Sequence, residues 1–74
     1  MEKSIYTRKY RQLLDILIKA RKRARMTQVK LARRLAEPQS FISKYERGQR
    51  RLDVAEFLTI AKLLKADLKG IINQ

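Results

Sequence analysis

The sequence predicts an all-α fold, and three observations support that prediction. Apolar residues recur at three- and four-residue spacing along most of the chain, the pattern of helices with one buried face. Pro38 and Gly48 fall at points where such helical patterns break or end. Thr27 and Asp53 stand directly before apolar runs, where their side chains can cap the first turn of a helix.

The length of 74 residues indicates one small domain over residues 1–74, with residues 1–6 flexible. The chain contains no Cys and no His, so we expect no disulfide, no metal site and no cofactor. A core of this size needs good helix packing, a dimer, or both. With no Cys, no apolar run long enough to cross a membrane and no signal-peptide core, we expect a cytoplasmic location.

The positive charge is large and uneven. The formal net charge is +12, which points to a polyanionic partner. Residues 1–34 contain twelve Lys or Arg and two acids, whereas residues 35–74 contain seven and five. The first half therefore suits neutralisation of DNA phosphates, which leaves base reading to neutral side chains of the second half.

Residues 27–48 form the central stretch and predict two short helices. Thr27 caps a first helix over residues 28–35. Pro38 opens a second helix over residues 38–47, and Gly48 follows as its left-handed C-terminal residue. Two such short helices joined by about three residues should cross at a steep angle, as in a helix-turn-helix.

The second of these helices carries a polar face suited to DNA. Gln39, Ser40, Ser43 and Lys44 share one side of it, and no acid falls between Gln39 and Tyr45. Gln pairs with adenine, Lys with guanine and Ser with either in a major groove. These four residues are the predicted base-facing set.

Residues 10–72 resemble the XRE family of helix-turn-helix proteins, which contains the phage repressors and Cro. The resemblance is carried by Thr27-Gln28, Leu31-Ala32, the run from Pro38 to Gly48 and the run from Arg50 to Leu58. It implies a compact five-helix, repressor-like domain, sequence-specific DNA binding and a homodimer. It also implies a phosphate contact for Gln28, base contacts for the four polar residues, and an ion pair between Arg21 and Glu46.

Two positions depart from the family pattern. The turn position that usually holds Gly is Ala36, which we expect at positive φ at a cost of roughly 1 kcal/mol. The usual Ser or Thr cap of the second helix is Pro38, so Glu37 or water must satisfy that helix start.

The remaining helices are expected over residues 7–24 and 54–64, followed by a short one. In the first, Tyr10, Leu13, Leu17, Ala20 and Ala24 should face the core, whereas Leu14 and Ile18 form a second row that widens the core contact or serves a dimer. The helix over 54–64 is apolar around much of its surface and should be central to the core. Asp67 caps the last helix, whose Ile71 and Ile72 are the other candidate dimer surface.

Further phosphate contacts are expected around the central stretch. Arg23 and Arg25 are as consistent with DNA contacts as with solvated charge, whereas Arg21 lies on the buried side and needs an acceptor such as Glu46. Gln28 either contacts a phosphate or only caps its own helix. The loop residues Gln49, Arg50 and Arg51 should contact phosphates, with the Tyr45 hydroxyl near the DNA backbone.

The sequence excludes common enzyme classes, because it has no His or Cys and no phosphate-binding glycine loop. The leading interpretation is a sequence-specific double-stranded DNA-binding regulator, a dimeric repressor on a pseudo-palindromic operator. An alternative is an antitoxin-like module that uses the same fold with a protein partner. A basic amphipathic membrane binder fits the first helix but not the capped remainder of the chain.

Overall fold

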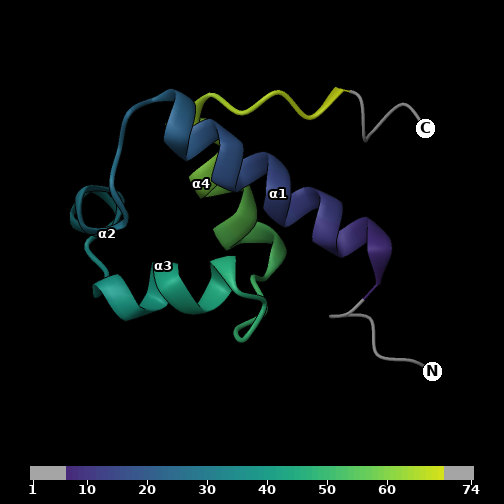
Figure 1. Cartoon of the computed structure of the whole chain (residues 1–74), viewed down its shortest axis with the longest axis horizontal. Helices are drawn as coiled ribbons and strands as arrows, with labels where there is room; N and C mark the ends of the chain where they lie inside the picture. The colour runs from purple at the N-terminus through teal and green to yellow at the C-terminus, as the bar shows by residue number, and fades with distance from the viewer. Residues whose placement is uncertain (1–6, 70–74) are drawn as a thin grey trace.

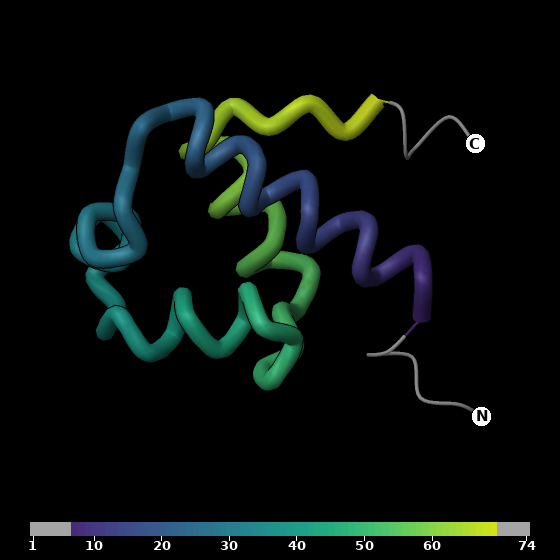
Figure 2. The backbone as a smooth tube through the Cα atoms, viewed as in Figure 1, coloured from purple at the N-terminus to yellow at the C-terminus, as the bar shows by residue number. Residues whose placement is uncertain are grey.

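The computed structural model describes residues 7–69, which form four helices and no strand. The helices are α1 (Arg8–Arg23), α2 (Gln28–Leu35), α3 (Gln39–Glu46) and α4 (Val54–Leu64). α2 packs on α3, and α1 packs on both α3 and α4 (Figure 1). Figure 2 looks down the axis of α2 while α3 runs across the view, so these two helices cross at the steep angle that their short connection predicts.

Side chains cap three of the four helix starts. The capping residues are Thr7, Thr27 and Asp53, whose oxygens accept backbone N–H groups of the first turn at 3.1, 3.0 and 2.7 Å. Glu56 Oε1 accepts the N–H of Asp53 at 3.0 Å in return, which completes the predicted capping box. Pro38 occupies the cap position of α3 without a side-chain hydrogen bond. The helix therefore begins at Gln39 and ends at Glu46, one residue inside each predicted bound.

Left-handed residues close the turns on either side of α3. Ala36 has φ 57°, as predicted for the position where the family usually has Gly. Its N–H reaches the carbonyls of Ala32 and Arg33 at the end of α2, which offsets part of the cost of this conformation. Gly48 has φ 77° and donates to the carbonyl of Tyr45 at 3.0 Å. These two residues set the direction of the chain just before and just after α3.

The core draws apolar side chains from all four helices and from the loop before α4: Tyr10, Leu14, Leu17, Ala20, Leu31, Ala32, Phe41, Ile42, Tyr45, Leu52, Ile60, Ala61 and Leu64. On α1 the buried row differs from the predicted one, since Leu14 is 1% exposed while Leu13 is half-buried and Ala24 is exposed. The reason is that α1 packs against both α3 and α4, which buries a wider arc. Leu14 is therefore a core residue, which confirms the predicted wider core contact and removes Leu14 from the alternative dimer surface, where Ile18 is half-buried.

The helix α4 is less central than predicted. It buries Ile60, Ala61 and Leu64, but Val54 is 76% and Leu58 54% exposed. Because α4 covers the core from outside, its first two turns present an apolar side to solvent.

The predicted last helix lies mostly outside the described residues, as do Ile71, Ile72 and residues 1–6. Asp67, its predicted cap, accepts the backbone N–H of Lys69 at 3.0 Å. Across residues 7–69, the helices are all too short or too polar to cross a membrane.

Candidate nucleic-acid interface

The predicted base-facing residues lie together on one side of α3. Gln39, Ser40 and Lys44 are exposed and Ser43 is half-buried. The opposite side of the helix is held in the core by buried apolar residues: Phe41, Ile42 and Tyr45. A rigid helix thus presents amide, hydroxyl and ammonium groups, and no carboxylate, to whatever lies against that side.

Gln28, at the start of α2, connects this surface to the interior. Its Nε2 donates to Glu46 Oε1 at 2.9 Å, and its Oε1 accepts from Gln39 Nε2 at a longer 3.4 Å. A primary amide has two N–H donors, and these contacts use only one of the two in Gln28. Gln28 therefore orients Gln39 and keeps a donor at the α2 N-terminus, where the helix dipole favours an anion.

Arg21 and Glu46, the predicted ion pair, are in bidentate contact. Arg21 Nε lies 2.7 Å from Glu46 Oε2, and Nη2 lies 3.2 Å from Oε1. Arg21 Nη1 also donates to the carbonyl of Met26 at 2.8 Å. Arg11 Nη2 donates to the backbone carbonyl of Glu46 at 3.1 Å, a contact that the sequence did not reveal because the two residues are 35 apart. The end of α3 is thereby tied to α1, to the α1–α2 loop and to α2.

Tyr45 does not reach the DNA side, and the prediction of a phosphate contact for it is wrong. Its side chain is 0% exposed, and its hydroxyl is buried without a hydrogen-bond partner. The ring makes an edge contact with Phe41 at 5.6 Å between centroids. Burial, and then the charge of Glu46, raise the pKa of Tyr45 well above its ordinary value. The residue faces inward because it lies one turn after Phe41, on the core side of α3.

The loop after α3 holds its cations in contacts within the domain. Arg50 forms a bidentate pair with Glu56 at 3.0 and 2.9 Å, and its guanidinium lies 4.6 Å from the centroid of the Phe41 ring. Hydrogen bonding to Arg50 lowers the pKa of Glu56. Arg51 lies 5.6 Å from the centroid of the Tyr10 ring. A phosphate contact by Arg50 would therefore have to be shared with Glu56.

The same loop is pinned to α1 from inside. Tyr10 Oη accepts the N–H of Leu52 at 3.0 Å in a buried position, 42 residues away in the chain. Gln49 Oε1 accepts from Arg47 Nη2 at 3.3 Å, and both residues are exposed. The predicted phosphate-contacting loop is thus held beside α3 by hydrogen bonds within the domain.

Two comparisons with known proteins bear on this arrangement. A helix-turn-helix family model matches residues 17–71, well over half of the chain. A solved structure of an XRE-family like protein from Pseudomonas syringae pv. tomato str. DC3000 is similar, with a TM-score of 0.80 and 43% sequence identity over 95% of this chain and 85% of that chain. No curated protein matches the sequence.

The chain belongs to the XRE helix-turn-helix family. It is a DNA-binding domain of that family, and such domains are typically non-enzymatic. Within residues 7–69, His, Cys, Asp and Glu side chains do not gather in groups of three or more that could hold a metal ion.

Cations surround α2 of this XRE domain. Arg23 and Arg25 are exposed in and after the last turn of α1, and Arg25 has φ 60°, which gives the α1–α2 loop its bend. The exposed cations of α2 itself are Lys30, Arg33 and Arg34. These side chains lie on α2 and on the segment just before it, so a polyanion at the α2 N-terminus, where Gln28 lies, would meet a positive field.

Proposed function

We propose that this protein is a sequence-specific double-stranded DNA-binding regulator, a dimeric repressor that reads the major groove with α3. The observation that carries the proposal is the exposed polar face of α3, which lacks acids and is anchored in the core from behind. Gln39, Ser40, Ser43 and Lys44 are the base-reading residues, and Gln39 is positioned by Gln28.

Phosphate contacts come from the residues that flank α3. We assign Gln28, Arg23 and Arg25 to phosphates on one side of the major groove, and Gln49, Arg50 and Arg51 to phosphates on the other side. Tyr45 is removed from the predicted set because it is buried. This division gives the backbone contacts to cations and helix ends and the base contacts to neutral side chains and one Lys.

Pairing of two chains would place two α3 helices in successive major grooves, about 34 Å apart, on a pseudo-palindromic operator. Burial of Leu14 leaves half-buried Ile18 alone on one of the two predicted pairing surfaces. Ile71 and Ile72, the other predicted surface, lie outside the described residues.

Selection of bound sequences from a random duplex library at about 150 mM salt tests this function, because non-specific phosphate binding is much reduced there. The expected result is a symmetric motif with half-sites one helical turn apart. An enriched motif without symmetry would contradict the dimer, and no enriched motif would contradict sequence-specific reading.

A matched pair of variants separates base reading from phosphate binding. Gln39→Ala should cost roughly 1–3 kcal/mol of binding free energy and relax the preference at one base pair. Arg25→Ala should weaken binding to all sequences alike and reduce the salt slope. Equal weakening by Gln39→Ala on every sequence would show that α3 does not read bases.

A further inference from the structure

Arg47 extends the polar face of α3 by one turn. It follows Ser43 by four residues and Lys44 by three, the spacing that places side chains on one face of a helix. Helical geometry continues to this position, because Arg47 has φ −86° and ψ 0° and its N–H donates to the carbonyl of Ser43 at 3.2 Å. Its side chain is exposed. The polar face of α3 therefore ends in a guanidinium that lies beyond the base-facing set.

The C-terminal end of α3 does not need this guanidinium. A cation near the end of a helix can bond its last carbonyls. Here the last four carbonyls of the helix already accept hydrogen bonds, three from backbone N–H groups of residues 47–50 and one from Arg11 Nη2 at 3.1 Å. Arg47 Nη2 donates to the neutral Gln49 Oε1 at a longer 3.3 Å. Because a guanidinium has five N–H donors, most of the capacity of Arg47 is open to an acceptor from outside.

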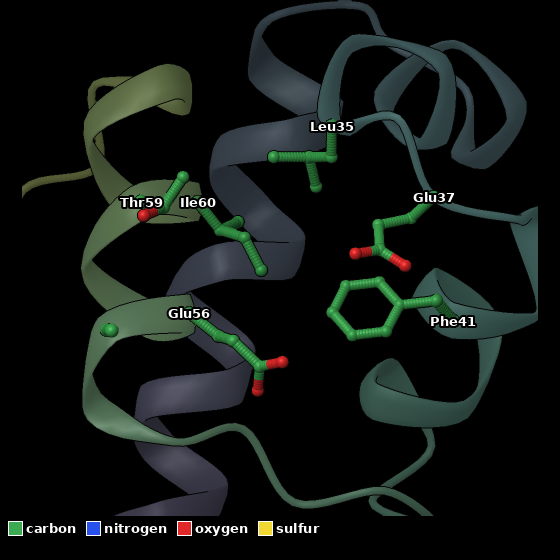
Figure 3. Close-up of a pocket in the computed structure, with 7 residues that line it drawn as sticks. Leu35, Glu37, Phe41, Glu56, Thr59 and Ile60 are labelled. Carbon is green, nitrogen blue, oxygen red and sulfur yellow. The ribbon is translucent and has the colours of Figure 1, made fainter.

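Arg50, the next arginine along the chain, is engaged differently. It is bonded to Glu56 at 3.0 and 2.9 Å and lies over the Phe41 ring. Figure 3 shows the Glu56 and Phe41 side chains extending toward one another from α4 and α3, so Arg50 is held on the side of α3 that faces α4. Within residues 7–69, Asp and Glu side chains form no ion pair with Arg47. A phosphate competes with a carboxylate for Arg50, but only with a neutral amide for Arg47.

The position of Arg47 at the end of α3 suits a phosphate rather than a base. In a helix-turn-helix, the N-terminal residues of the recognition helix contact base edges. An eight-residue helix is about 12 Å long, close to the roughly 12 Å width of a major groove, so its last turn comes near the phosphates at the edge. Figure 1 shows α2 beside the start of α3 and the following loop at the other end. Gln28 and Arg47 thus flank the polar face from opposite ends.

We propose that Arg47 binds a DNA phosphate at the C-terminal end of α3, on the side of the groove opposite the Gln28 contact. This contact rests on the proposed function, since α3 must enter the major groove for it to form. It adds a charge-assisted anchor on the reading helix itself. Such an anchor has no base preference, and it weakens as salt rises.

Binding of the full chain to two short duplexes, one of A·T pairs only and one of G·C pairs only, tests the proposal. Arg47→Ala should weaken binding to both duplexes by the same factor and reduce the slope of log affinity against log salt by about 0.9. The loss at about 50 mM salt should then exceed the loss at about 200 mM roughly three- to fourfold. Arg47→Lys, which keeps the charge, should retain the wild-type slope.

Lys62→Ala is the matched control for lost charge. It removes one cation from exposed surface in the last turn of α4, at the end away from α3 (Figure 1), and should change both affinities less than about twofold. Arg50→Ala should reduce the salt slope less than Arg47→Ala, because Glu56 already offsets its charge. Arg47→Gln, which keeps a long polar side chain without charge, should repeat the effect of Arg47→Ala, and circular dichroism should show unchanged helix content in each variant.

Three results would overturn the proposal. They are a wild-type affinity and slope in Arg47→Ala, an equal loss in Lys62→Ala, or a loss confined to one duplex, which would make Arg47 a base-reading residue. Failure of the proposed function is seen separately, as the absence of an enriched motif when the wild-type chain selects from the random library.

Discussion

The Arg21–Glu46 and Arg50–Glu56 pairs, both bidentate, have the same chemistry and different surroundings. In the Arg21–Glu46 pair the side chains are 11% and 7% exposed, whereas in the Arg50–Glu56 pair they are 41% and 29% exposed. The first pair also shares its charges with the Met26 carbonyl and the Gln28 amide. In the Arg50–Glu56 pair, Glu56 also accepts the backbone N–H of Asp53 and Arg50 also lies over the Phe41 ring.

The difference in burial changes what each pair does. Removing water from two charges is costly, so a buried pair is stable only while both partners and their extra hydrogen bonds are present. An exposed pair is screened by water and salt and contributes about 0.2–1 kcal/mol. The buried pair therefore makes the position of α3 depend on α1 and α2. The exposed pair only holds Arg50, in the loop after α3, against the first turn of α4.

The largest expected effect is loss of one buried partner. Arg21→Ala should lower the free energy of unfolding by about 3–5 kcal/mol, because the buried Glu46 carboxyl group would lose its cation. Urea unfolding followed by circular dichroism measures this loss. Arg21→Met with Glu46→Leu, which removes both charges, should recover most of it. A loss below 1 kcal/mol for Arg21→Ala would show that the two pairs are equivalent.

A smaller effect is expected at the exposed pair. Arg50→Ala should lower the free energy of unfolding by about 1 kcal/mol or less, and the double-mutant cycle with Glu56→Gln should give a coupling of about 0.2–1 kcal/mol. The same urea experiment applies. A coupling as large as that between Arg21 and Glu46 would remove the distinction drawn from burial.

The exposed pair should also respond to acid. The pKa of Glu56 is lower in the folded protein than its ordinary value of about 4.3. The pair's contribution is then fully present above the ordinary pKa and is lost as the pH falls through the lowered folded value. Unfolding free energies of the wild type and Glu56→Gln should differ at pH 6 and converge in acid. Arg50→Ala should show the same convergence, and parallel curves down to pH 2 would contradict the lowered pKa.

The smallest expected effect concerns Tyr45, the neighbour of Glu46 in the buried cluster. Its hydroxyl is buried without a partner, so Tyr45→Phe removes an unsatisfied polar group. We expect unchanged stability or a gain of up to about 1 kcal/mol, and unchanged DNA affinity at constant salt. A loss of DNA affinity in Tyr45→Phe would contradict our inference, drawn from burial, that Tyr45 makes no phosphate contact.

Much of the helix-turn-helix could be predicted because its signals are local. Thr27, Gly48 and the Asp53–Glu56 capping box act on backbone groups within a few residues, and each takes the conformation that its chemistry favours. Ala36 takes the left-handed conformation that its turn position requires. The Arg21–Glu46 contact was predictable from a resemblance and from the position of Arg21 beside the core. The grouping of Gln39, Ser40, Ser43 and Lys44 followed from helical periodicity alone.

Residues that touch distant parts of the chain were less predictable. Periodicity placed Leu13 in the core and left Leu14 open between a wider core contact and a dimer surface, because it gives the spacing of an apolar face but not its width or the element that covers it. For the same reason the burial of the Tyr45 hydroxyl, which we predicted near the DNA backbone, was not foreseen. The phosphate contact of Arg50 was predicted from its place in the loop after α3, and nothing in the local sequence marks Glu56 and the Phe41 ring as its partners.

By itself the sequence determined the class of fold, the turn chemistry and the identity of the polar face on α3, since each depends on neighbours along the chain. Only the tertiary structure decided which cations are already paired and which aromatic ring is buried. The physical reason is that desolvation and ion pairing depend on which side chains folding brings together, and packing settles that between helices far apart in the chain.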